Sequence, residues 1–350
     1  MGNAREEQGM RAPQRRANAV PASGRVSRRA ALSIIAGAVV ASPAGAHAQA
    51  GTDWPSQPVR YINIFPLGGA TDTLSRLYCS KMSEITGQQF VVENRSGSGG
   101  NVGVDAIAKS RPDGYTVGLG SIAPHAIAPT LYASLPFDAA RDFTFISGLW
   151  QLPNLLVVNN DVPARTVPEL IALLKANPGK YAYGSSGIGT TPHLSGELLK
   201  QMVGADILHV PYRGGAPALL DLLAGRVHLI MDNIPGLLPT AQEGRIRALA
   251  VTGPQRSPVA PELPTMSEVL PGFEITSWGA VCGPAGIPAP VVERHSAFAR
   301  RALESPDLVR SFQELGATPW WTTPGEIAAF RAREEARLAP LIRASGARVE

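Results

Sequence analysis

The sequence predicts an α/β fold with two lobes, each a mostly parallel sheet flanked by helices. Short apolar runs typical of buried strands alternate with segments in which apolar residues recur at helical spacing. This alternation occurs in two series, which begin near residues 59 and 155. Strands that alternate with helices form parallel sheets covered on both faces, so each series predicts one lobe.

The elements of the two series set the expected lobe boundaries. The first series has strand-like runs at 59–65, 90–92 and 115–119 and a helical pattern at 74–85. The second has strand-like runs at 155–158, 181–183, 207–210 and 227–231, with helical patterns at 168–175, 194–202 and 217–223. A strand-like run at 273–281 and helical patterns at 291–303, 307–315 and 324–345 follow. We expect this last part to return to the first lobe, which gives a leader of residues 1–50, a first lobe of residues 51–151 and 276–350, and a second lobe of residues 152–275.

Residues 1–50 are typical of an export signal. Arg28 and Arg29 precede an apolar run at 31–40, and Ala46-His47-Ala48 follows as a small-residue cleavage site. The apolar run is about half as long as a membrane-spanning helix, which needs roughly 20 residues. The paired arginines favour the twin-arginine route, although Ala31 stands where that signal usually has phenylalanine. We therefore expect an exported protein.

The positive charge of the chain lies in this leader. The whole chain has a formal net charge of +4, but residues 1–50 carry seven arginines and two glutamates, which leaves −1 on the rest. No basic field is then expected that would attract nucleic acid or anionic lipid. No later segment is apolar enough to span a membrane. We expect the mature part to be soluble and monomeric, without a nucleic-acid partner.

The reactive residue types give no catalytic or metal-binding pattern. Export makes a disulfide between Cys79 and Cys282 chemically possible, but both lie in element patterns that favour buried free thiols. The histidines beyond the leader are scattered, with no pair at i and i+4. No nucleophile, base and orienting group can be assigned together. We expect no cofactor, no metal site and no enzymatic activity.

Two glycine-rich turns follow predicted strands where helices begin. They are Phe65-Pro66-Leu67-Gly68-Gly69-Ala70-Thr71-Asp72 and Gly184-Ser185-Ser186-Gly187-Ile188-Gly189-Thr190-Thr191-Pro192-His193. Ligands of open α/β sheets bind at such strand ends, and free N–H groups at a helix start favour an anion. Turns that face each other across a cleft could hold a carboxylate with backbone donors alone. The alternative is two ordinary tight turns, with Asp72 and Thr191 as helix caps.

Three nucleotide and hydrolase motifs are nearly matched but fail at one position each. Thr190 replaces the lysine of a phosphate-binding loop, which removes the charge that such a loop needs. Ile188 replaces a glycine of the hydrolase nucleophile turn around Ser186. Val102 replaces the last glycine of a dinucleotide-binding turn. These classes of site are therefore not predicted.

Three side chains near the predicted strand ends have two interpretations each. His193 lies just inside a helix start, where it is either a ligand donor or a capping residue. Arg213 is either a clamp for an acid or a solvated loop residue. Asp232 ends an apolar run before Asn233, where it either accepts from a ligand amine or hydroxyl or caps the next turn.

Short motifs in a specific order cover residues 53–348. They include Trp54-Pro55, Phe65-Pro66 with Gly68-Gly69, Val92-Glu93-Asn94-Arg95, Pro112-Asp113-Gly114-Tyr115, Tyr183-Gly184-Ser185-Ser186-Gly187, His209-Val210-Pro211-Tyr212 and Arg247-Ala248-Leu249-Ala250-Val251-Thr252. Each is modest alone, but together they resemble the Bug family, the solute receptors related to tripartite tricarboxylate transporters. The resemblance implies a periplasmic-binding-protein fold (type II-like) whose lobes close over a small organic acid or amide in the periplasm. Membrane subunits of a transporter would be its partners.

The resemblance and the turns together give the candidate ligand-binding residues. They are Phe65, Gly68, Gly69, Ala70, Asp72, Ser121, His125, Ser186, Gly189, Thr190, His193, Arg213 and Asp232. Ile64 and Leu67 stand where the family often has proline, Ala128 where it often has asparagine, and Ile188 at a usually polar position. These departures predict a more apolar cleft and favour an aromatic or longer-chain carboxylate. A sensor that feeds a signalling partner and a secreted hydrolase stay open as alternatives.

Overall fold

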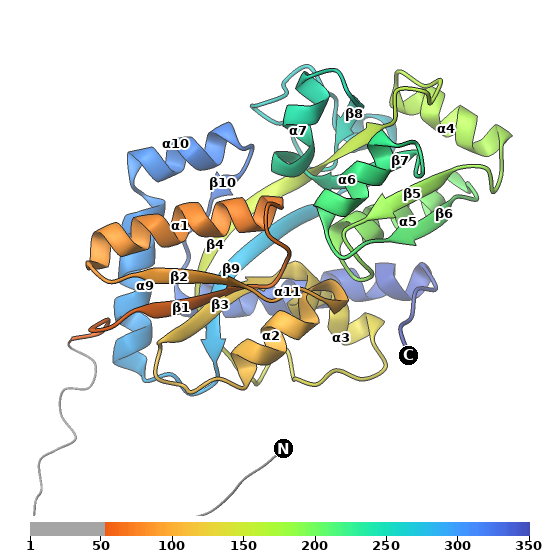
Figure 1. The fold of residues 1–350 in the computed structure, drawn as a ribbon. Helices are drawn as coiled ribbons and strands as arrows, with labels where there is room; N and C mark the ends of the chain where they lie inside the picture. Colours follow the sequence, from red (N-terminus) through yellow and green to blue (C-terminus); the bar gives the residue numbers. More distant parts are fainter. Residues whose placement is uncertain (1–52) are drawn as a thin grey trace, which may run out of the picture. The chain divides into compact units, whose positions relative to one another are not determined.

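The computed structural model describes residues 53–350, and the expected export signal lies outside this part. The described residues form two lobes, coloured orange to yellow and green in Figure 1, with long strands running between them. In the first lobe, β1 (Val59–Asn63) lies between β2 (Phe90–Asn94) and β3 (Thr116–Ser121). It is parallel to both, as the strand and helix alternation predicts.

Two long strands connect the lobes. Strands β4 (Phe143–Val158) and β9 (Thr276–Pro284) pair antiparallel from Phe143 and Pro284 to Pro153 and Thr276. Beyond Pro153, β4 changes partners and its residues 154–158 pair with β7 and β8 of the second lobe. This change of partner supports the lobe boundaries expected near residues 151 and 275, which stay a prediction.

The second sheet is built around β5. Strand β5 (Ala182–Ser185) is parallel to β6 (Leu208–Pro211) and to β7 (Leu229–Asn233). The strand order is β2-β1-β3-β9-β4-β7-β5-β6, and β8 (Arg247–Val251) and β10 (Thr318–Pro319) also pair with β4. The parallel pairs thus lie toward the two ends of this order. The pairs that involve β4 or β9 are antiparallel, which the sequence alternation does not reveal.

Helices cover both sheets. Those packed around the first sheet are α1 (Ala70–Thr86), α2 (Asn101–Ala108), α3 (Ala128–Leu131), α9 (Ala289–Leu303), α10 (Pro306–Glu314) and α11 (Pro324–Ala344). Those of the second lobe are α4 (Val167–Ala176), α5 (Thr191–Val203), α6 (Gly215–Leu223), α7 (Ile234–Gln242) and α8 (Met266–Val269). Short helical turns stand at Ser98–Gly100 and Ala123–Ile127. Within the described residues, no helix combines the length and hydropathy needed to cross a bilayer.

The crossing strands run through the core. Trp150 on β4 and Trp278 on β9 are both fully buried, and each such side chain contributes on the order of 2 kcal/mol by leaving water. A second apolar cluster, which includes Leu155, Ile230 and Leu237, packs β4 and β7 against α7. Cys79 and Cys282 are buried free thiols. These two apolar clusters hold the strands, and therefore the turns that follow them, in fixed positions.

Candidate ligand-binding site

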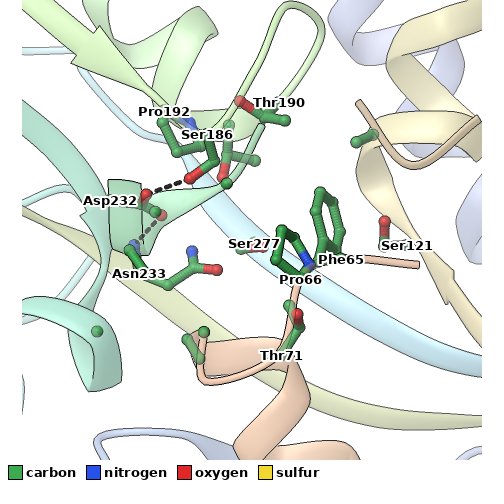
Figure 2. Close-up of a pocket in the computed structure, with 18 of the residues that line it drawn as sticks. Phe65, Pro66, Thr71, Ser121, Ser186, Thr190, Pro192, Asp232, Asn233 and Ser277 are labelled. Atoms are coloured by element: carbon green, nitrogen blue, oxygen red, sulfur yellow. Dashed lines mark hydrogen bonds between the residues drawn. The ribbon is translucent and has the colours of Figure 1, made fainter. Parts of the chain in front are cut away.

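A cavity of about 150 Å³ lies between the lobes, beside the crossing strands (Figure 2). The first lobe contributes Phe65, Pro66, Gly68, Gly69, Ala70, Thr71, Ser121, Ile122 and Ala123. The second lobe contributes Ser186, Thr190, Thr191, Pro192, Gly214, Gly215, Ala216, Leu219, Asp232, Asn233, Gly236 and Leu237. Trp150 and Ser277 come from the crossing strands. The lining is therefore shared between both lobes and their connection.

Four helices begin at this cavity. Their first residues are in the lining at Ala70 of α1, Thr191 of α5, Gly215 of α6, and Asn233 at the start of α7. In none of the four does the N-cap side chain bond a first-turn amide. The first amides of a helix have no partner within it and form the positive end of the helix dipole. The arrangement therefore suits an anionic group held by backbone donors.

Asp72 holds the first turn in place. Its Oδ2 accepts from the amide of Gly68 at 3.0 Å and from Arg76 Nε at 3.0 Å, and its Oδ1 accepts from Asn94 Nδ2 at 2.8 Å. Burial alone would raise the pKa of Asp72, but the hydrogen bonds from Arg76, Gly68 and Asn94 hold that pKa below its ordinary value. Asp72 is thus an ionised residue whose acceptors serve the turn, and it does not line the cavity.

Two stacked histidines hold the second turn. His193 Nδ1 accepts from the amide of Gly189 at 3.2 Å, and His209 Nε2 is bonded to Ser185 Oγ at 2.7 Å. The two rings stack with centroids 4.5 Å apart. Burial lowers the pKa of both, that of His209 to about 3, so both rings are neutral and Nδ1 of His193 can accept. These histidines position the turn and lie outside the cavity lining.

Asp232 is the one ionisable side chain among the residues that line the cavity within 53–350. One carboxylate oxygen, Oδ2, accepts from Ser186 Oγ in a short contact, and Oδ1 accepts from the amide of Asn233 at 2.7 Å. Burial raises the pKa of Asp232 to about 6, against the hydrogen bonds from Ser186 and Asn233, which lower it. Figure 2 shows Asp232, Ser186 and Asn233 on one side of the cavity, with Phe65, Pro66 and Ser121 on the other.

A buried asparagine ties two of the helix starts to strand β4. Asn154 Oδ1 accepts from Asn233 Nδ2 at 2.7 Å and from Thr191 Oγ1 at 3.4 Å. Its Nδ2 donates to Ser195 Oγ at 3.1 Å. Asn154 has no exposed surface, so these bonds are made away from water. It therefore sets where α5 and α7 begin, although it does not line the cavity.

The structure brings both predicted turns to one cavity, with eight of the predicted residues in its lining. These are Phe65, Gly68, Gly69, Ala70, Ser121, Ser186, Thr190 and Asp232. The other five predicted residues, Asp72, His125, Gly189, His193 and Arg213, lie outside it. His125 is fully buried between Phe143 and Phe145, with its Nδ1 facing Ser121, and Arg213 is exposed on its loop.

Sequence reasoning missed the starts of α6 and α7 as parts of the site. Signals for both are present in the sequence. Gly214-Gly215 is separated from the end of β6 by two residues. Ile234-Pro235 directly follows β7, and proline is favoured in a first helical turn. Trp150 and Ser277 carry no such signal, because they lie inside crossing strands.

Comparison with known proteins identifies relatives over most of the chain. Residues 74–347 match the tripartite tricarboxylate transporter family receptor. The UPF0065 protein in the tcbD-tcbE intergenic region of Pseudomonas sp. (strain P51) is 40% identical over 298 residues, which are 85% of this chain and 88% of that protein. The structure of R. palustris Rpa4515 with adipate is 38% identical with a TM-score of 0.83, covering 85% of this chain and 100% of that one. The structure of periplasmic binding protein BugD is 31% identical with a TM-score of 0.81, at the same coverage.

Proposed function

This chain belongs to the tripartite tricarboxylate transporter receptor family, and on that premise we propose that it is a periplasmic receptor that captures a small organic acid between its lobes. It is the family that the sequence motifs predicted. Among the structural relatives, BugD is a periplasmic binding protein and Rpa4515 was solved with adipate. The export signal expected at residues 1–50 and the relative BugD, a periplasmic binding protein, support the location.

Four helices begin at one cavity, and this observation is the main support for carboxylate binding. Within residues 53–350, the cavity lining contains no lysine, arginine or histidine, so a bound carboxylate would rely on neutral donors. Each helix start contributes about 0.3–1 kcal/mol toward an anion when exposed, and up to about 2 kcal/mol when partly buried. Amide donors to an ionised acceptor also make stronger hydrogen bonds than neutral pairs. Several donors that converge can therefore replace a cationic side chain.

Closure of the lobes is the proposed capture step. The lining is divided between the lobes, so a ligand makes its full set of contacts only when both surround it. Such a ligand shifts the population toward the closed state by its differential affinity. Strands β4 and β9, which run between the lobes, are the proposed hinge. Release to membrane subunits of a tripartite transporter completes the proposed role.

The hydrolase hypothesis gains no support from Ser185 and His209, whose side chains are hydrogen-bonded beside the site. Ser185 and His209 share a hydrogen bond of 2.7 Å, but Ser185 is fully buried and lies outside the cavity lining. Its Oγ also accepts from the amide of Gly187 at 3.2 Å, so it serves the turn. A substrate in the cavity would not reach it.

Thermal-shift and calorimetric titrations test the capture proposal. Probes are adipate, hexanoate and benzoate, with hexanamide as the uncharged control. An acid at 100 times its Kd should add about 2.7 kcal/mol to the free energy of unfolding, because it binds only the folded protein. Hexanamide should give no shift. A shift with hexanamide equal to that with the acids would contradict recognition of the carboxylate, and no shift with any probe would contradict capture of these acids.

A further inference from the structure

The charge in the cavity is unevenly distributed. Asp232, the one ionisable side chain that the described part of the chain adds to the lining, lies on the second-lobe side beside Ser186 and Asn233 (Figure 2). The opposite side is formed by Phe65, Pro66, Ser121 and the start of α1, where the polar groups are backbone amides and the hydroxyls of Thr71 and Ser121. A ligand group that reaches the second-lobe side therefore meets a carboxylate acceptor in addition to the starts of α5, α6 and α7, whereas a group on the opposite side meets no ionisable side chain among the described residues.

The Asp232 carboxylate is held in place yet keeps acceptor capacity. Each of its oxygens takes one hydrogen bond, from Ser186 Oγ or from the amide of Asn233, and a carboxylate oxygen can accept two. Gly215 of α6 lies over the same oxygen as Ser186, since a Cβ placed on it would be 2.7 Å from Oδ2. Only a residue without a side chain leaves that oxygen uncovered.

Among the residues that the structure describes, no charged side chain pairs with Asp232. The elements around it present Ser186, Gly215 and Asn233. The titratable groups on these elements have other partners: Tyr212 donates to Asp221, and Asp221 pairs with Arg226. On α5, Glu197 bonds Lys200 and Tyr183, and His193 accepts from Gly189. His209 is bonded to Ser185, and the paired residues of β4 are uncharged.

We propose that Asp232 makes the second-lobe end of the cavity a subsite for a hydrogen-bond donor. The receptor then prefers an organic acid whose second polar group is an amide, a hydroxyl or an ammonium. It takes a dicarboxylate only together with one proton, shared between Asp232 and the far carboxylate. This inference rests on the proposed function, and it places the first carboxylate at the start of α1, across the cavity from Asp232.

The reason for the proton is the repulsion between two carboxylates that share a dry site, which prevents both from being ionised. Burial already raises the pKa of Asp232 to about 6, so above that pH binding of a dicarboxylate must take up a proton. Its affinity should then fall about tenfold per pH unit above pH 6. An ω-amide donates to the ionised Asp232 and needs no proton.

Calorimetry with adipate and its monoamide tests the subsite. Between pH 6 and pH 8, the Kd of adipate should rise roughly 50-fold, while the Kd of the monoamide should change less than about threefold. Titrations in buffers of different ionisation enthalpy should show uptake of about one proton per adipate at pH 8. The Asp232→Asn variant should abolish the pH dependence for adipate and weaken the monoamide about tenfold, because the acceptor is replaced.

Asp221→Asn is the matched control, since it makes the same change on α6 outside the cavity lining. It should leave both affinities and the pH dependence unchanged. Adipate binding without proton uptake, or unchanged pH dependence in Asp232→Asn, would overturn the subsite while leaving capture of acids intact. The proton count is measured on the unaltered protein, so it decides even if the variant fails to fold. If neither probe binds at either pH, the proposed function is contradicted and the subsite with it.

Discussion

Gly214 lies against the ring of Pro66 where the two lobes meet beside the cavity. A Cβ placed on Gly214 would be 2.8 Å from Pro66 Cγ and 2.9 Å from Pro66 Cδ. The φ of Gly214 is 163°, an extended conformation that any residue adopts, so the contact and not the backbone requires glycine. Pro66 belongs to the first-lobe turn and Gly214 precedes α6 of the second lobe. The space between Gly214 and Pro66 therefore limits how closely the two lobes can approach each other.

Gly214→Ala should weaken ligand binding without destabilising the ligand-free protein. The added methyl keeps the lobes apart by meeting a proline ring, which has little freedom to move away. We expect the Kd for adipate to rise about tenfold, which corresponds to about 1.4 kcal/mol. Calorimetry and small-angle scattering of the liganded protein would check affinity and closure. Gly325→Ala on α11 is the control, because its Cβ would meet nothing within 4 Å. Equal affinities in all three proteins would contradict closure at this contact.

Gly215→Ala should damage the Asp232 subsite while the helix stays stable. The new Cβ would lie 2.7 Å from Asp232 Oδ2 and 3.4 Å from Ser186 Oγ, so their hydrogen bond must shift. Alanine is also the better helix former, by about 1 kcal/mol within a helix, so the melting temperature should not fall. We expect the monoamide of adipate to bind about tenfold more weakly. Gly325→Ala on α11, outside the cavity lining, adds the same methyl without a contact and should leave the affinity unchanged. The prediction is wrong if the two variants bind alike.

Gly69 and Gly189 should respond differently to valine. Gly69 lines the cavity and has φ −80°, and its Cβ would make an ordinary contact of 3.7 Å with the carbonyl of Pro66. Gly69→Val should therefore abolish binding at a stability loss of about 1 kcal/mol at the N-cap. Gly189 has φ +80°, and its Cβ would be 2.8 Å from Leu131 Cδ2. Gly189→Val should also lower the free energy of unfolding by about 3 kcal/mol. Chemical denaturation and calorimetry together separate the two effects, and identical unfolding curves would contradict this account.

The parallel strands toward the two ends of the strand order could be predicted because the sequence pattern of each one is local. Strands such as β1 and β5 are short apolar runs that end at glycine-rich turns. The first half of β4 has no such signature. Gly148 interrupts its apolar pattern because a Cβ there would be 2.4 Å from the carbonyl of Trp320, a residue far along the chain. The antiparallel pairing with β9 likewise depends on tertiary packing that no local pattern contains.

The binding turns could be predicted from glycines at strand ends, but the side chains that position them could not. Asn154 is one polar residue within an apolar strand, and its partners Ser195 and Asn233 are 41 and 79 residues away. His193 has a residue type and position that suit a ligand donor equally well. Only its distance to the amide of Gly189 shows that its acceptor nitrogen is already used. Such roles depend on hydrogen-bond partners, which sequence spacing does not determine.

Buried histidines should make the protein lose stability as the pH falls below 6.5. Burial lowers the pKa of His125 and of His295 to about 3, whereas a histidine in the unfolded chain has a pKa near 6.5. The unfolded state therefore binds more protons between these values. The stability is fully present above pH 6.5 and is lost as the pH falls toward 3. At pH 5, His125 and His295 each lower the free energy of unfolding by about 2 kcal/mol. Burial raises the pKa of Asp232 to about 6, so its protonation in the folded state increases the free energy of unfolding at pH 5 by about 1 kcal/mol.

His295→Phe isolates one contribution to this pH dependence. The ring centroids of His295 and Trp54 are 4.8 Å apart. Phenylalanine keeps a ring that can stack on Trp54 and removes the titrating group. The loss of free energy of unfolding between pH 7 and pH 5 should be about 2 kcal/mol smaller in the variant than in the original protein. Urea denaturation followed by circular dichroism at both pH values measures the difference, independently of any constant change in packing. Equal losses in the two proteins would mean that His295 is protonated in the folded state, and its burial beside Trp54 and Phe90 could then not set its pKa.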